Sequence, residues 1–318
     1  MTKTKAPFLK SSIKTSDIMR DVLIALIPVS AMAIVKFGIR SLWMILIGIL
    51  SSIIFEYLYQ KLTKQDITVK DLSAAVTGLL VALSYPSNVP FWIIILGSFI
   101  AIVLVKQIAG GLGNNIFNPA VFSRVLIKIL FTPIITNWIT PGPDAVSIAT
   151  PLAFVGNGQK EILAGAPEIS QIFFGEIGGG IGETVKWAIL LGFLYLVIRK
   201  IIHFEMPLAV MGGLFLTAML FGESDLNFAF YHILSGTAMF AAVFMVTDYA
   251  SSPLNRRARF YYALCIGILT GILRQLFDLP GGIGVAILIM NLTAPLLETW
   301  IVPRVFGHKG VSIISQSR

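Results

Sequence analysis

Charged residues and cysteine are scarce in this sequence of 318 residues. Only 13% of the residues are charged, which is about half the share found in soluble domains, and 56% are hydrophobic. The single cysteine, Cys265, lies in an apolar run, which excludes a disulfide framework and a set of iron–sulfur ligands. The three histidines are too scattered along the chain to indicate a haem or a metal cluster. Any redox cofactor is therefore expected to be organic, and no metal site is predicted.

A cleavable signal peptide is also missing, because the first 17 residues are polar and basic and contain no short apolar core. The chain has instead a series of apolar runs of roughly 16 to 22 residues, close to the about 20 that a membrane-spanning helix needs. An all-α polytopic membrane protein is therefore predicted. Ten segments are expected to be membrane helices: 21–36, 39–60, 72–84, 90–109, 115–131, 185–202, 205–222, 230–247, 258–277 and 283–300.

The ten segments divide into two sets of five. A Gly-Gly-x-Gly motif precedes the fifth segment at 110–113 and the tenth at 281–284, and each is followed by an Asn and then a Pro. The third segment is too short for a plain span, and it matches the eighth in small residues. An odd number of spans in each repeat makes the second copy inverted, and inverted repeats with broken or half helices are typical of midplane sites. The expected parts are an N-terminal segment 1–17, a first repeat 18–131, a loop 132–184, a second repeat 185–302 and a tail 303–318.

The positions of Lys and Arg predict how the chain lies in the membrane. Of the 24 basic residues, 17 fall on the side of the N-terminus and five on the opposite side. This bias places both termini in the cytoplasm and the polar loop 132–184 outside. The net charge of +8 is then a topology signal, and no nucleic-acid partner is expected. Asp21 and Glu56 lie near segment ends and are expected at the membrane interfaces.

The external loop contains the sequence Asp-Ala-Val-Ser-Ile-Ala-Thr at 144–150. Pro151 biases Thr150 toward extended geometry, and the small Ala149 leaves room for a bulky group beside the Thr150 hydroxyl. The pattern of Asp144, Ser147, Ala149 and Thr150 resembles the flavinylation motif of the Rnf ferredoxin:NAD oxidoreductases and the sodium-pumping NADH:quinone reductases. In that family the final Thr carries FMN through a phosphoester bond. The alternative is an ordinary surface loop with a Thr-Pro turn, since Asp, Ser and Thr are common in loops.

Other motifs extend this resemblance to the D-type membrane protein of Rnf complexes (RnfD) over roughly residues 15–300. It shows in GGLGNNIFNPA at 110–120, in Ala-Thr-Pro-Leu at 149–152 and in TDYASSP at 247–253. One departure is Ile148, which stands where the family often has Gly. The resemblance implies covalent FMN on Thr150. It also implies a fold of about ten helices as a 5+5 inverted repeat, similar to the B-type membrane protein of the quinone reductases (NqrB) and to the urea-transporter architecture.

The 110–120 stretch and the fifth segment hold further candidate residues. Asn115 and Asn118 offer amide donors and acceptors at a broken helix start. In the quinone-reductase relatives this stretch lies near a non-covalent riboflavin, which implies a second flavin here; the alternative is a helix break whose Asn side chains cap backbone groups. Arg124 and Lys128 share one helix face. Arg124 is a candidate for binding a flavin or an anion, whereas Lys128 is expected to reach the outer interface.

The function implied by the resemblance is that of a flavin-carrying subunit in the bacterial cytoplasmic membrane. Its complex would couple electron transfer between ferredoxin and NAD to movement of Na⁺ or H⁺. The chain is not expected to be catalytic alone or to bind NAD directly, because no Gly-x-Gly-x-x-Gly turn follows a strand. Other membrane and peripheral subunits are therefore expected as partners, together with a flavin transferase for maturation. Neither the ion nor the direction of electron flow is predicted.

Two alternatives remain open. The NqrB protein of the sodium-pumping NADH:quinone reductase is similar in motif and topology, but it usually has a longer N-terminal region than the 17 residues here. A cofactor-free solute channel is a different class of protein, because a 5+5 inverted repeat also resembles urea transporters. The channel hypothesis leaves the motif at 144–150 without a purpose. A flavin bound to the purified chain would separate the two classes.

Overall fold

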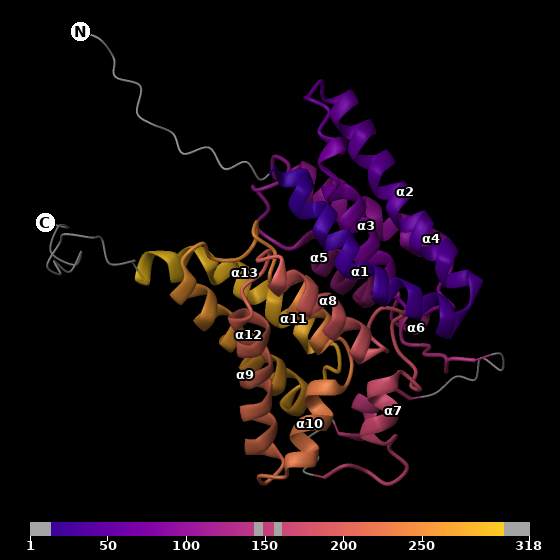
Figure 1. Ribbon diagram of the computed structural model, residues 1–318, viewed down its shortest axis with the longest axis vertical. Helices are drawn as coiled ribbons and strands as arrows, with labels where there is room; N and C mark the ends of the chain where they lie inside the picture. The colour runs from indigo at the N-terminus through magenta and orange to yellow at the C-terminus, as the bar shows by residue number, and fades with distance from the viewer. Residues whose placement is uncertain (1–13, 143–148, 156–160, 302–318) are drawn as a thin grey trace, which may run out of the picture.

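The computed structural model describes residues 14–142, 149–155 and 161–301, and within these the chain is helical with no β-strand (Figure 1). Each of the ten predicted segments coincides with a helix or a pair of helices. These are α1 (Thr15–Phe37), α2 (Ile39–Leu62), α3 (Ser73–Leu83), α4 (Phe91–Phe99) with the π-helix η2 (Ile100–Gln107), α5 (Pro119–Leu130), α8 (Lys186–Ile198), α9 (Glu205–Phe221), α10 (Leu226–Leu234) with α11 (Ala238–Phe244), α12 (Arg256–Leu276) and α13 (Gly282–Trp300). Four short elements were not predicted: η1 (Val69–Asp71), α6 (Thr132–Ile135), η3 (Pro151–Phe154) and α7 (Ile169–Phe174).

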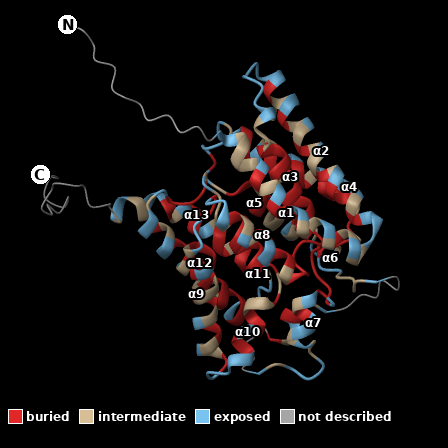
Figure 2. Cartoon of the chain, viewed as in Figure 1, coloured by how far each residue is buried: buried red, intermediate tan, exposed pale blue. Residues whose placement is uncertain are grey.

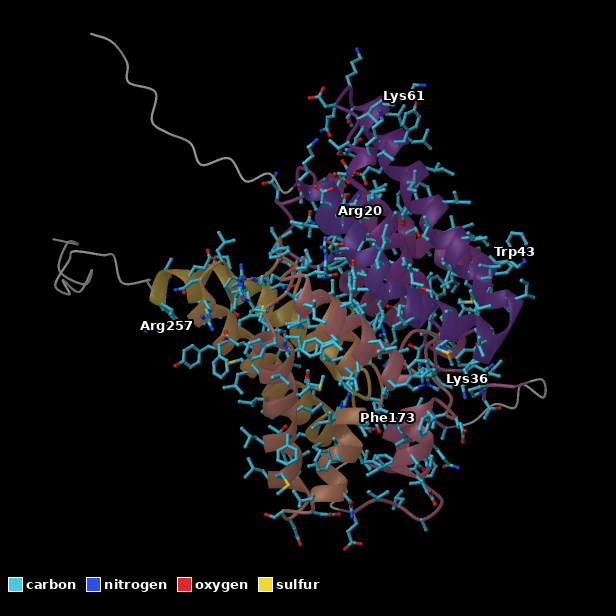
Figure 3. The ribbon with its side chains drawn as sticks, viewed as in Figure 1. Arg20, Lys36, Trp43, Lys61, Phe173 and Arg257 are labelled. Carbon is cyan, nitrogen blue, oxygen red and sulfur yellow. The ribbon has the colours of Figure 1, made fainter. Side chains whose placement is uncertain are left out.

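The lengths and compositions of these helices indicate a multi-pass membrane protein. Among the described residues, α1, α2 and α13 are each long and apolar enough to cross a membrane, and α10 with α11 forms an apolar pair, bent by 57°, that is either a broken span or a re-entrant loop. Shorter apolar helices are α3, α4 with η2, α8 and α9. Large apolar side chains such as Leu216 and Leu220 on α9 are exposed, and so is Trp43 on α2, which is labelled in Figure 3. Such side chains suit a surface in contact with lipid.

The two short helices α3 and α11 are buried, α11 near the middle of the molecule and α3 among the helices of the first half (Figure 2). All residues of α11 are buried, and in α3 only Thr77 is not. The eighth predicted segment is thus two helices, because Ser235, Gly236 and Thr237 interrupt it between α10 and α11. Backbone groups at the ends of such short helices cannot reach water in a membrane, so they need partners from the protein itself.

Glycines allow the closest helix contacts in the structure. Helix α2 lies against α3 and α4, and α9 lies against α12. At the first crossing a methyl group on Gly48 would lie 2.6 Å from the carbonyl oxygen of Gly78. At the second, a methyl group on Gly213 would lie 2.4 Å from the carbonyl oxygen of Leu264. Small residues at such positions let two helix backbones approach each other, as is typical of membrane interfaces.

Replacing Gly48 with Ala is therefore expected to destabilise the fold by about 1–3 kcal/mol, because the backbone of Gly78 cannot move aside as a flexible side chain could. The measurement is the thermal unfolding midpoint of the purified chain in detergent. Gly212→Ala on α9 is the matched control, because nothing lies within 4 Å of an added methyl group there. Equal midpoints for the two variants would contradict the close crossing.

Asp21 and Glu56, which were expected at the membrane interfaces, both have side chains that are buried within the protein. The Glu56 side chain is fully buried, and its Oε2 atom lies 2.8 Å from Nζ of Lys106. Asp21 is only 4% exposed and accepts hydrogen bonds from Tyr195 Oη at 2.9 Å and Arg199 at 3.2 Å. Both carboxylates can be buried because partners from other helices satisfy them, and the sequence does not show those partners.

Three basic residues that were counted as flanking charges are also buried, namely Lys106, Lys186 and Arg274. Buried basic residues bond to groups inside the protein, so their positions do not indicate which side of the membrane a segment end faces. Leaving them out takes one residue from the inner count and two from the outer count, so the bias keeps its direction. In Figure 3, Arg20, Lys61 and Arg257 lie along one side of the molecule and Lys36 lies toward the opposite side.

Candidate functional site

Thr150 lies at the edge of a cavity of about 280 Å³ between the two halves of the chain, which we call the Thr150 cavity. Six parts of the chain form its wall: one face of α5, residues 135–138 around the end of α6, the segment 149–153, the segment that leads into α8, the break between α10 and α11, and the residues just before α13. The lining residues with polar or charged side chains are Arg124, Lys128, Thr136, Thr150, Glu183, Thr184, Lys186 and Thr237. The cavity therefore combines the predicted attachment residue with a dense set of charges.

The backbone around Thr150 is extended, with φ −68° and ψ 155°, as the following proline predicted. Thr150 precedes η3, but its hydroxyl makes no capping hydrogen bond to that turn. Leu152 anchors the segment, because it is buried and lies against Gly236. Ala149 is exposed and also lines the cavity. The Thr150 hydroxyl thus lines the cavity and does not cap the turn that follows it.

The other two residues of the predicted motif, Asp144 and Ser147, lie outside the described residues. Their part in the site stays a prediction.

Glu183 is the centre of the polar wall of this cavity. Its Oε2 atom lies 3.1 Å from Arg124 and also accepts a hydrogen bond from the Thr237 hydroxyl, while Oε1 accepts from the Gly180 backbone at 3.1 Å. Burial alone would raise the pKa of Glu183, but Arg124, Lys186 and the two hydrogen bonds outweigh burial and hold this pKa below its ordinary range. Glu183 is therefore an anion at neutral pH, and it is paired with Arg124.

Positive charge exceeds negative charge around the cavity. Arg124, Lys128 and Lys186 line it, whereas Glu183 is the only carboxylate among the lining residues that the structure describes. Lys186 is fully buried, and its Nζ atom donates to the carbonyl oxygens of Gly236, at 2.9 Å, and of Glu183. Burying a cation away from water without a nearby anion costs free energy. The cavity thus fits an anionic group.

Sequence reasoning did not find Glu183, Lys186 and Thr237, which were treated as loop, flank and helix residues. The small-residue match between the third and eighth segments was the one signal, because it marks the break that contains Thr237.

A buried basic residue lies beside one end of α10 and another beside one end of α3. Arg274 donates to the carbonyl oxygens of His232, at 2.6 Å, and Ser235, at 3.3 Å, where α10 ends. In the first half, Lys106 donates to the Ser73 hydroxyl at 2.6 Å, where α3 begins. Arg274 lies at a helix C-terminus, where a cation also interacts favourably with the helix dipole, whereas Lys106 at the start of α3 is paired with Glu56. Both basic residues are followed by a buried glutamine and then by a Gly-Gly-x-Gly motif, at 110–113 and 281–284.

Asn115 belongs to a different part of the molecule. It lines two adjoining cavities of about 80 Å³ and 320 Å³, which share Tyr249 as well and which we call the Asn115 cavities. Asn115 is 5% exposed, and its side-chain oxygen has no hydrogen-bond partner among the described residues. Lys106 and Asp248 line the smaller cavity. An unpaired buried acceptor is costly, so a ligand with N–H or O–H donors fits here.

Asn118 has a structural role at the start of α5. Its side-chain oxygen accepts from the backbone of Ala120 at 3.0 Å and Val121 at 3.1 Å, which caps the helix. Its side-chain nitrogen donates to the Met245 carbonyl oxygen at 3.0 Å. Asn118 lines the smaller Asn115 cavity with its polar groups already bonded. Helix α5 connects the two sites, because Asn118 stands at its start and Arg124 lies about 9 Å further along its axis.

Comparison with known proteins gives a consistent result over almost the whole chain. The model of the NQR2, RnfD, RnfE family matches residues 2–307. The chain is 37% identical over 310 residues to the D component of the Na⁺-translocating ferredoxin:NAD⁺ oxidoreductase complex of Acetobacterium woodii. The matched region covers 96% of this chain and 95% of that relative. It is 33% identical to the D component of the proton-translocating ferredoxin:NAD⁺ oxidoreductase complex of Clostridium ljungdahlii, with 97% and 96% covered.

A third relative is the D component of the ion-translocating oxidoreductase complex of Escherichia coli strain K12, which is 33% identical over 346 residues, with 96% of this chain and 97% of that one covered. The matched lengths leave no large part of the chain or of these relatives unaccounted for. The helical architecture, the apolar surface and the motifs at 110–120 and 247–253 agree with this similarity. The chain belongs to the NQR2, RnfD, RnfE family.

Proposed function

We propose that this chain is the RnfD membrane component of an Rnf-type complex that couples electron transfer between ferredoxin and NAD to translocation of Na⁺ or H⁺. The observation that carries the proposal is the near full-length similarity to three proteins that are named as the D components of such complexes. These names favour RnfD over the NqrB protein of a quinone reductase. The chain would act as one part of a translocase and would not be catalytic alone.

FMN attached to Thr150 is the proposed redox group. Three features support it: the Thr150 hydroxyl makes no capping bond, its backbone is extended, and the cavity beside it holds more positive than negative charge. A phosphoester at Thr150 would add the missing negative charge. The isoalloxazine supplies the electron-transfer chemistry when it is bound, and the chain positions it and sets its electrostatic surroundings. Asp144 and Ser147 complete the motif that a flavin transferase would recognise.

A second, non-covalent flavin is proposed at the Asn115 cavities. The unpaired side-chain oxygen of Asn115 suits the ring N–H or a ribityl hydroxyl of riboflavin. Asn118 would contribute as the cap that fixes the start of α5. The two flavins would then lie toward opposite ends of α5.

An inverted five-plus-five repeat is proposed for the fold. It is supported by contacts between helices that hold the same place in each half, α1 with α8 and α5 with α13. The basic residue and glutamine at 106–107 and at 274–275 also hold equivalent places. The side marked by Arg20, Lys61 and Arg257 in Figure 3 would face the cytoplasm together with both termini, and Thr150 would face outward.

Other subunits are proposed as partners, because the relatives are named as components of multi-subunit complexes. The described residues of this chain hold no group of three or more His, Cys, Asp or Glu that could bind a metal ion, and they form no strand for a dinucleotide-binding turn. We propose that other subunits of the complex make the contacts with NAD and with ferredoxin.

The test is genetic and biochemical. The gene for this chain is deleted in its bacterium, and inverted membrane vesicles are assayed for NAD⁺ reduction by reduced ferredoxin and for the accompanying uptake of Na⁺ or H⁺. Both activities are expected to disappear and to return when the wild-type chain is restored. Activities that survive the deletion would contradict the proposal. Solute flux through the purified chain in liposomes, with no bound flavin, would favour the channel instead.

A further inference from the structure

Lys128 differs from the other cations of the Thr150 cavity. It lies near the C-terminal end of α5 and is half-buried, and its Nζ atom is 2.7 Å from where a methyl group on Gly281 would be. No ion pair or hydrogen bond from its ammonium group to any of the residues described in the structure is found. Its charge thus faces the cavity without an acceptor.

The neighbouring cations already donate hydrogen bonds to acceptors of the protein. Arg124 donates to Glu183 at 3.1 Å, and Lys186 donates to two backbone carbonyl oxygens. Thr237 and the Gly180 backbone hold Glu183 in place, so this carboxylate is not free to turn toward Lys128. The position of Lys128 thus calls for an anion that is absent from the described part of the chain.

A phosphodiester has the right chemistry for this position. It carries one negative charge and two non-bridging oxygens that accept hydrogen bonds, and an ammonium group offers three donors. Thr150 and Lys128 line the same cavity from different elements, the segment before η3 and helix α5. An anion on Thr150 could therefore meet the charge of Lys128 without displacing the Arg124–Glu183 pair.

We propose that Lys128 is the counter-ion of the phosphodiester that joins FMN to Thr150 and that it holds the flavin against the cavity. This inference rests on the proposed flavinylation of Thr150. Lys128 is a positioning residue, because it would bind the linkage and not the reacting ring. Arg124 has the separate role of keeping Glu183 paired.

The test compares Lys128→Gln, Lys128→Arg and Lys36→Gln in the full chain, matured with its flavin transferase and kept in its complex. Lys36→Gln is the control, since it removes one lysine charge at a residue that does not line the cavity. The fluorescence of the gel band reports how much flavin is attached. In the native complex, fluorescence anisotropy and quenching by neutral acrylamide report how firmly that flavin is held.

Lys128→Gln is expected to lower the anisotropy and to raise the quenching constant of the attached flavin. Loss of a charge-assisted hydrogen bond should shift the equilibrium between bound and detached flavin by about tenfold or more. Lys128→Arg and Lys36→Gln are expected to resemble the wild type. Gly281→Ala tests the geometry independently: it keeps the charge but displaces the ammonium group, so it should loosen the flavin as well.

Two other outcomes are distinguishable. If the wild-type chain carries flavin but Lys128→Gln matches it in anisotropy and quenching, Lys128 is not the counter-ion, and the flavinylation proposal still stands. If the wild-type chain carries no flavin with an active transferase, both proposals are overturned.

Discussion

Thr150→Ala is expected to remove all covalent flavin from this chain while leaving its fold intact. The Thr150 hydroxyl makes no capping hydrogen bond, and the side chain is only half-buried, so its loss should cost little stability. An alanine has no oxygen through which a phosphoester could form. The measurement is flavin fluorescence of the denatured gel band after co-expression with a flavin transferase, with the unfolding midpoint recorded in parallel.

Thr132→Ala is the matched control for this experiment. Thr132 is exposed and begins α6, and it does not line the Thr150 cavity. Its variant should keep the wild-type fluorescence. Equal fluorescence in Thr150→Ala and wild type would place the flavin on another residue and would contradict the site.

Glu56→Gln is expected to have the largest effect on stability. Lys106 is 1% exposed, and its Nζ atom lies 2.8 Å and 3.0 Å from the two carboxylate oxygens of Glu56. Loss of that carboxylate leaves a buried cation whose hydrogen-bond partners are the Ser73 hydroxyl and a neutral amide. Breaking a buried ion pair on one side costs about 3–5 kcal/mol. Thermal unfolding in detergent is the measurement.

The double variant Glu56→Gln with Lys106→Met distinguishes the cost of an unpaired buried charge from the cost of disturbed packing. Removing both charges leaves no unpaired ion, and replacement of a whole buried pair by neutral groups is often close to neutral. The double variant is therefore expected to regain much of the lost stability. If it is less stable than Glu56→Gln alone, the unpaired Lys106 is not the cause of the loss.

The positions of the helices were predictable because a membrane helix is a local property of the sequence. A run of apolar residues becomes a helix in lipid, where each backbone group needs a partner within its own segment. The third segment, 72–84, was correctly expected to be short, because it has too few apolar residues to span. The extended backbone at Thr150 was equally local, since Pro151 determines it.

The charged groups of the site were not predictable in the same way, because their partners are distant in sequence. Arg124 and Glu183 are 59 residues apart, and Glu56 and Lys106 are 50 apart. A lone charge beside an apolar run gives the same pattern whether it reaches the interface or pairs inside. Glu56 was therefore expected at the membrane surface, and Lys186 was counted as a flanking charge, although both are buried.

The most direct measurement of the central claim is mass spectrometry of the peptide that contains residues 144–150, taken from the chain isolated in its native membrane complex. The proposed function predicts that this peptide carries the added mass of one phosphoester-linked FMN and that fragmentation places the group on Thr150. An unmodified peptide, in a complex that transfers electrons from ferredoxin to NAD and whose other subunits are fully recovered, would contradict the claim.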